Sequence, residues 1–274
     1  MRPRRRAFTP LLLAALLGTT PVLGTSVGAI AATVPATAAR PAAHVVDPVS
    51  AARPYRLDLA DANDFVAQTT FVQCVGASMQ MMLNIDGAND RSARTQGRLQ
   101  SIARALSGPT RAGFERKGAS VRGWTDGLNQ LDAGPYQMVG ADTLAEALRL
   151  AAMAIRTTGR PVGLLVWAGR HAWVMSGFEA TADPLRTHRF RVTKAIVLDP
   201  LYPHGSASWG RSPRPREAVS PAFLGRQFVP RRRGTWAGAP LGAAGQSLAA
   251  LAGKYVIVMP FIRIVVDRNR PRAI

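Results

Sequence analysis

Residues 68–85 read QTTFVQCVGASMQMMLNI, and this stretch decides the fold of the chain. From Cys74 onward, small and apolar residues recur at the spacing of one helix face, and Gly87 ends the pattern. The residues of that face are Ala77, Ser78, Met81, Met82 and Ile85. The spacing predicts a buried helix that begins at or near Cys74.

Cys74 is also the only cysteine among the 274 residues, which excludes an internal disulfide bond. A solitary thiol has three common roles: a small buried apolar side chain, a partner in an intermolecular disulfide, or a reactive nucleophile. A thiolate at a helix start is stabilised by the helix dipole and by free backbone N–H groups. The position of Cys74 therefore favours the nucleophile.

The rest of the chain reads as helices followed by strands. The further predicted helices are 91–106, a short one within 118–129, and 143–158. Thr143 and Glu146 form a capping box at the start of the last of these. The predicted strands are 56–59, 162–167, 171–178, 190–198 and 255–266. This order predicts an α+β fold, with N-terminal helices packed on a C-terminal antiparallel sheet.

The N-terminus has the layout of a bacterial secretory signal. Arg2 and the arginines at 4–6 form a basic region, and an apolar run follows over 11–32. Small residues offer cleavage sites at 29–31 or 36–38. The pattern predicts export, so that the protein is secreted or held at the cell envelope.

Two details of this leader leave alternatives open. Residues 5–8, Arg-Arg-Ala-Phe, resemble a twin-arginine signal, which would mean export in the folded state. An uncleaved membrane anchor over 11–32 is the alternative to a cleaved signal. The predicted organisation is a signal peptide over 1–38, a linker over 39–55, and one domain over 56–270. That domain includes a basic loop excursion at about 203–250, with a helical part near 247–251.

The chain carries a formal net charge of +19, nearly all of it from arginine. Such a surface favours polyanions such as nucleic acid, anionic lipid or acidic cell-wall polymers, although GC-rich coding also enriches arginine. No sequence motif for reading nucleic acid is present. The expected partner is therefore an anionic cell-envelope polymer or a lipid surface rather than a specific nucleic acid. The arginines expected to contribute are Arg211, Arg214, Arg216 and Arg231 to Arg233.

A cysteine nucleophile needs a histidine base that is held by a third polar group. Of the four histidines, His44 falls in the predicted linker, His188 among the arginines of a hairpin connection, and His204 in a loop. His171 alone begins an apolar strand directly after a tight Gly-Arg turn. A partly buried histidine satisfied by backbone groups is the alternative reading, but the context favours His171 as the base.

The third group should lie on a strand next to that of the base. Asp199 fits, because it follows the 190–198 strand and precedes Pro200. An Asp-Pro turn without catalytic meaning is the alternative interpretation of the same residues. Asp183, in the hairpin connection, is a second candidate for the orienting carboxylate.

Acyl transfer also needs hydrogen-bond donors for the developing oxyanion. The backbone N–H of Cys74 is one donor if this residue begins the helix. Gln68 lies six residues upstream, near enough for its side-chain amide to point into the same site. Gln73, which directly precedes the cysteine, is the alternative donor.

These segments together resemble a known superfamily. The residues that carry the resemblance are Gln68, 74–79 (CVGASM), 159–162 (GRPV), 169–178 (GRHAWVMSGF) and 198–200 (LDP). Their order is similar to that of the papain-like cysteine peptidases, and within them to the bacteriocin-processing (double-glycine) peptidases and their exported bacterial relatives. The resemblance covers residues 65–200 and, more loosely, 250–266.

The resemblance implies a papain-like fold and a role for each residue of the set. Cys74 would be the nucleophile, His171 the base, Asp199 the group that orients the ring, and Gln68 a donor to the oxyanion. The implied activity is that of a peptidase or amide hydrolase, which forms a thioester with a peptide or protein substrate and requires no metal or organic cofactor. Val75 stands where the family usually has glycine, which crowds the backbone after the nucleophile. The alternative function is therefore a weak or inactive scaffold that binds anionic envelope polymer or lipid.

Overall fold

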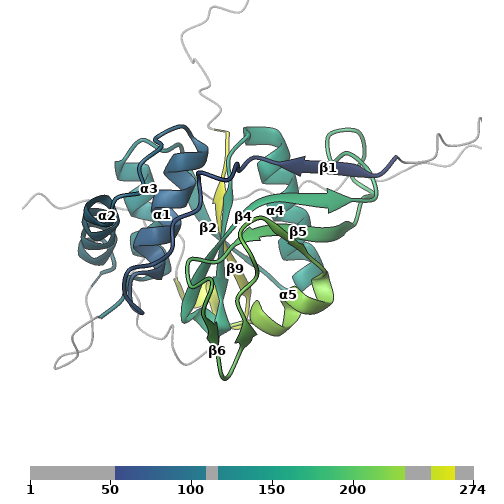
Figure 1. Ribbon diagram of the computed structural model, residues 1–274. Coiled ribbons are helices and arrows are strands. Elements are labelled where there is room, and N and C mark those ends of the chain that lie inside the picture. The colour runs from purple at the N-terminus through teal and green to yellow at the C-terminus, as the bar shows by residue number, and fades with distance from the viewer. Residues whose placement is uncertain (1–52, 109–116, 232–247, 263–274) are drawn as a thin grey trace, which may run out of the picture. The chain divides into compact units, whose positions relative to one another are not determined.

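An antiparallel sheet of seven strands runs through the residues that the computed structural model describes, 53–108, 117–231 and 248–262 (Figure 1). The strand order is β2-β9-β3-β4-β5-β8, and β1 pairs with β4 off this path. The strands are β1 (Tyr55–Asp58), β2 (Tyr136–Ala141), β3 (Val162–Val166), β4 (His171–Ala180), β5 (Val192–Leu198), β8 (Glu217–Val219) and β9 (Tyr255–Pro260). Strands β6 (Gly205–Ser206) and β7 (Gly210–Arg211) form a separate hairpin.

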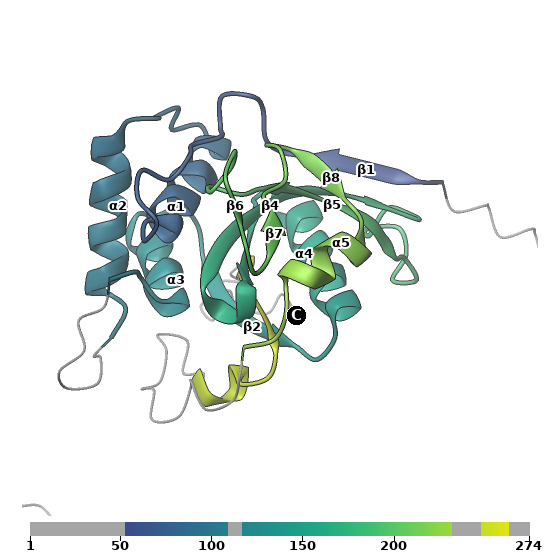
Figure 2. The same ribbon diagram turned by 60° about the horizontal axis from the view of Figure 1, so that its bottom comes forward.

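Helices cover both faces of the sheet (Figure 1). The helices are α1 (Cys74–Ile85), α2 (Ala93–Ala105), α3 (Val121–Gln130), α4 (Leu144–Thr158) and α5 (Pro221–Gln227). Helices α1 and α3 pack on one face, with α2 on the far side of α1 from the sheet (Figure 2), while α4 and α5 pack on the other face. The predicted α+β arrangement, with N-terminal helices against a C-terminal antiparallel sheet, is confirmed. Within the described ranges, no helix has both the length and the apolar character needed to cross a bilayer.

Consecutive residues of the central strand β4 enter two different cores. Ala172 and Val174 pack with the helices α1 to α3, whereas Trp173 and Met175 pack with α4 and α5. All four side chains are fully buried, because successive residues of a strand point to opposite faces and both faces are covered. Strand β4 is therefore a firmly held element, and its first residue is His171.

The predicted helices and strands are present, with differences at their ends, and β2 is a strand that the sequence pattern did not predict. Strand β9 ends at Pro260, and residues 263–266 of the strand predicted over 255–266 lie outside the described residues. The capping box of α4 is formed, since the Thr143 hydroxyl accepts a hydrogen bond from the Glu146 N–H at 3.1 Å. Gly159 ends this helix in the left-handed conformation, with φ 66°. A 3₁₀ turn, η3 (Leu248–Leu251), occupies the place of the helix expected at 247–251.

The expectation of a surface excursion at 203–250 is wrong for part of that segment. Strand β8 pairs with β5, and Leu224 and Phe228, at 0% exposure, fill the core beneath α4 and α5. The apolar residues of this segment are hard to recognise in the sequence, because proline and arginine residues lie between them and helix α5 is only seven residues long. Residues 232–247, like the predicted signal peptide and most of the linker at 1–52, lie outside the described residues.

Candidate active site

Cys74 is the first residue of α1, and its thiol is partly exposed. The helix behind it is buried, since Val75 is 3% and Met79 0% exposed. The preceding residue, Gln73, makes no side-chain cap. Among the described residues, the N–H groups of Cys74 and Val75 have no hydrogen-bond partner. A helix start with free N–H groups and an accessible thiol is suited to binding or carrying negative charge.

His171 and Asp199 meet because their strands are neighbours in the sheet. Strands β4 and β5 pair with Val174 opposite Leu198, which brings the start of β4 close to the end of β5. The His171 Nε2–H donates to Asp199 Oδ1 at 2.7 Å, and the same oxygen accepts the Leu201 N–H at 2.9 Å. His171 is 4% and Asp199 0% exposed. The carboxylate therefore fixes both the orientation and the tautomer of the ring.

The other ring nitrogen of His171 lies beside the thiol. Burial lowers the pKa of His171, but hydrogen bonds to Asp199 and Cys74 and the charges of these two groups outweigh it and raise the pKa to about 9. Because Nε2 is bonded to Asp199, the nitrogen that faces Cys74 is Nδ1. The helix is held against this strand by the buried Ser78, whose hydroxyl donates to the Ala172 carbonyl at 3.2 Å. The two flanking groups therefore favour the protonated form of the ring.

An aromatic side chain that the sequence analysis did not single out covers the histidine. The Trp167 ring stacks on the His171 ring, with 4.2 Å between centroids and 27° between planes. Trp167 and Ala168 both have positive φ, 56° and 53°, in the short turn between β3 and β4. The indole N–H donates to Gln227 Oε1 at 2.6 Å, and the Gln227 amide donates in turn to the Trp209 carbonyl. No local pattern in the sequence predicts this stack, because it depends on a hydrogen bond to Gln227 of α5 and on an uncommon backbone conformation.

Among the described residues, neither of the two glutamines considered as oxyanion donors forms a hydrogen bond with the Cys74 thiol. Gln68 is tied to the segment after Asp199, since its N–H donates to the Pro200 carbonyl at 2.7 Å. Its side-chain amide donates to the Thr70 carbonyl at 3.0 Å, and its Oε1 is buried without a partner. Gln73 Oε1 accepts from the Thr69 hydroxyl. Each side chain retains an amide N–H that a substrate oxygen can accept.

The backbone after the nucleophile is crowded at Gly76 and not at Val75, where crowding was expected. Val75 fits into the core with α1 to α3. At Gly76 there is no room for a side chain, because a Cβ would lie 2.8 Å from the Gln96 carbonyl oxygen and 2.9 Å from Gln100 Cβ. The glycine at 76 thus allows α1 and α2 to approach closely just after the nucleophile.

The other candidates are placed away from this cluster. Asp183 forms two hydrogen bonds with Arg156, at 3.0 and 3.1 Å, which lower the pKa of its carboxyl group. His188 and His204 are exposed, and His44 lies outside the described residues. The structure therefore brings together Cys74, His171 and Asp199 and none of these alternatives.

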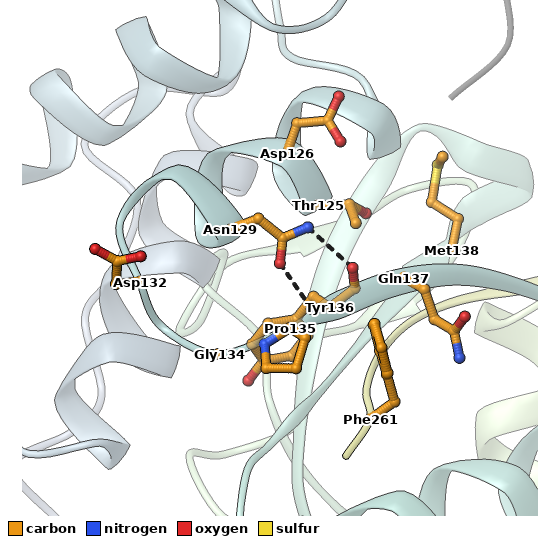
Figure 3. Close-up of a pocket in the computed structure, with 10 residues that line it drawn as sticks. All are labelled: Thr125, Asp126, Asn129, Asp132, Gly134, Pro135, Tyr136, Gln137, Met138 and Phe261. Carbon is orange, nitrogen blue, oxygen red and sulfur yellow. Dashed lines mark hydrogen bonds between the residues drawn. The ribbon is translucent and has the colours of Figure 1, made fainter. Parts of the chain in front are cut away.

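A cavity of about 590 Å³ lies between α3, β2 and the end of β9 (Figure 3). Asn129 borders it and brackets Tyr136 with two hydrogen bonds: it donates to the Tyr136 carbonyl at 3.0 Å and accepts the Tyr136 N–H at 2.7 Å. Its lining includes neither Cys74 nor His171. The geometry that suggests chemistry is therefore separate from this cavity.

Comparison with known proteins adds no family to these observations. No protein-family model matches the chain, and no curated protein matches it significantly.

Proposed function

We propose that the chain is an exported papain-like cysteine hydrolase that cleaves peptide or amide bonds through Cys74. The observation that carries the proposal is the hydrogen-bonded series from Cys74 to His171 to Asp199, drawn from three distant segments. Each member has the environment that its role needs: a helix start for the thiol, a strand end for the ring, and full burial for the carboxylate. The arrangement of helices before the sheet is in keeping with the resemblance to papain-like enzymes.

The proposed reaction begins with the Cys74 thiolate attacking the carbonyl carbon of the scissile amide. As the S–C bond forms, the carbonyl π electrons move to oxygen, and the free N–H of Cys74 stabilises the resulting oxyanion. The protonated His171 then gives its Nδ1 proton to the amine nitrogen while the C–N bond breaks. The product of this half-reaction is a thioester between the acyl group and Cys74.

Hydrolysis of the thioester completes the cycle. His171, now neutral, takes a proton from a water molecule as that water attacks the thioester carbonyl. The S–C bond breaks, the carboxylic acid leaves, and the thiolate and the imidazolium are restored. A pKa of about 9 keeps the ring protonated at neutral pH, which suits its role as the acid that protonates the leaving amine.

Alkylation by iodoacetamide tests the proposal directly, because Cys74 is the only thiol of the chain. We expect wild-type protein to be labelled near neutral pH. His171→Ala should be labelled at about one tenth of that rate or below, since a thiol without a neighbouring imidazolium is mostly protonated at neutral pH. Cys74→Ala serves as the blank. Equal labelling rates for wild type and His171→Ala would overturn the proposal.

A second candidate function, binding of anionic envelope polymer, is supported by exposed arginines on helix α2. Arg211 pairs with Glu217 at 2.9 Å, and Arg216 pairs with Asp58 at 2.9 Å, so these charges are largely compensated. A further group of arginines lies on α2, a helix without any acidic residue.

Arg94 and Arg98 are exposed, lie one turn apart on α2, and pair with no carboxylate in the described part of the chain. We propose that they bind anionic polymer or lipid, whether or not the chain is an enzyme. Retention on a heparin matrix measures this, and Arg94→Gln with Arg98→Gln should elute at lower salt than wild type. Arg189→Gln with Arg191→Gln removes the same charge from another exposed site. If both double variants elute together, α2 is not the binding surface.

A further inference from the structure

Helix α2 turns two buried glutamines toward the segment that carries the nucleophile. Gln96 is 0% and Gln100 5% exposed, and they lie one turn apart on the inner side of the helix. Burial of an amide is unfavourable unless its donors and acceptors are bonded. The partners of these two amides are mostly backbone groups of residues 67–76.

Gln100 holds the backbone on both sides of the cysteine. Its Oε1 accepts the Gly76 N–H at 2.9 Å, and its Nε2 donates to the Val72 carbonyl at 2.9 Å. The two bonded residues lie two positions after and two positions before Cys74. Because Gln73 makes no side-chain cap, this remote amide satisfies one of the free N–H groups of the first turn of α1.

Gln96 holds the segment one step further upstream. Its Oε1 accepts the Thr69 N–H at 2.8 Å and the Thr69 hydroxyl at 3.0 Å, and its Nε2 donates to the Ala67 carbonyl at 3.0 Å. Gln68 lies between these two residues. The same side chain therefore fixes the stretch that carries the proposed oxyanion donor.

We propose that Gln96 and Gln100 are positioning residues that hold Cys74 against His171, an inference that rests on the proposed function. They act through the backbone and do not touch a substrate. A neutral amide suits this place, since it caps the helix start without adding a negative charge that would compete with the thiolate. Loss of the Gln100 amide lets the segment 72–76 move, which separates the thiol from the imidazolium. The thiol then lacks its contact with the imidazolium and reacts more slowly with an electrophile.

The chain offers a matched control for this idea in Gln80. Gln80 is 1% exposed, belongs to α1, and donates to the carbonyls of Asp90 and Ser92 at 2.9 and 3.1 Å. Gln80→Met removes these two hydrogen bonds and a longer one, at 3.5 Å, that Gln80 Oε1 accepts from Gln96 Nε2. Gln100→Met removes two hydrogen bonds of a buried glutamine at the interface of the same two helices, and only this change removes a direct bond to the nucleophile segment.

The experiment measures the rate of iodoacetamide labelling between pH 5 and 10, together with the thermal unfolding midpoint. We expect Gln100→Met to be labelled about tenfold more slowly than wild type at pH 6, with a smaller difference in rate at pH 10. Gln80→Met should lower the unfolding midpoint while its labelling profile stays as in wild type. Equal profiles for Gln100→Met and Gln80→Met would overturn the positioning role.

Two further variants separate the possible failures. If His171→Ala leaves the profile unchanged, the proposed function itself is wrong; if His171→Ala shifts it and Gln100→Met does not, only the positioning role is wrong. Thr69→Val removes a hydroxyl that lies within hydrogen-bond distance of both Gln96 Oε1 and Gln73 Oε1 at an exposed position, so it retains the fold even where Gln100→Met does not. We expect Thr69→Val to change the labelling profile in the same direction as Gln100→Met, with a loss of about threefold in labelling rate. If Gln100→Met does not fold and Thr69→Val is labelled as wild type is, the result counts against the proposal.

Discussion

The charge state of His171 makes the stability of the protein depend on pH in a defined direction. Its pKa is about 9 in the folded protein, against 6.5 for an unperturbed histidine. Since the folded value is the higher one, the stabilisation is present in full below pH 6.5 and is lost as the pH rises through about 9. We therefore expect the free energy of unfolding to fall on the alkaline side of neutrality.

The size of the effect follows from the same two values. The interval from 6.5 to about 9 corresponds to about 3 kcal/mol, at 1.36 kcal/mol for each pH unit. Solvent screening reduces this little, because His171 is 4% and Asp199 0% exposed. A loss of about 3 kcal/mol is a large part of the 5–15 kcal/mol that is usual for a folded domain.

Urea unfolding followed by tryptophan fluorescence at pH 6, 7.5 and 9.5 provides the measurement. His171→Phe is the reference protein, since it keeps a flat ring against Trp167 but has no titrating nitrogen. Only the slopes against pH are compared, so any constant cost of the substitution cancels. If wild type and His171→Phe lose the same free energy between pH 6 and 9.5, the ring is not held as an imidazolium and the reasoning is refuted.

Three further predictions concern single side chains. Gly76→Ala should lower the free energy of unfolding by about 1–3 kcal/mol in urea titrations, because the new methyl group meets the backbone of Gln96, and an unchanged midpoint would contradict the close approach of α1 and α2. Asp199→Asn should slow iodoacetamide labelling at pH 7 by about tenfold, since His171 loses the charge that keeps it protonated; wild-type labelling would show that the carboxylate has no such role. Arg211→Gln should change stability by less than about 1 kcal/mol, because its pair with Glu217 is exposed, and a larger loss would mean that the β6–β7 hairpin supports the fold.

The sequence predicts the elements that carry the cluster because each has a clear local period. The helix from Cys74 and the strand from His171 both begin where the pattern places them. The contact between them involves residues almost a hundred positions apart, and only the order of the segments and the resemblance suggest it. Asp199 could be proposed because it directly follows a strand that was expected to lie next to the strand of His171, so that its side chain could be expected near the ring.

The support around the site escapes sequence reasoning for physical reasons. Gln96 and Gln100 interrupt the apolar face of α2, so in the sequence they weaken a helix pattern instead of marking a function. Their importance depends on how closely α2 packs against α1. The short helix α5 did carry a local signal, since Ser220 caps it and Pro221 is its first residue, but seven residues are too few to show a period.

The stack of Trp167 on His171 gives the protein an optical property. An indole in contact with an imidazole ring senses whether that ring is charged, because a cation over the ring face polarises the indole π electrons. Emission from Trp167 is therefore expected to follow the protonation of His171 as the pH is raised through about 9. The fold contains its own spectroscopic reporter of the proposed catalytic base, and no label has to be introduced near Cys74.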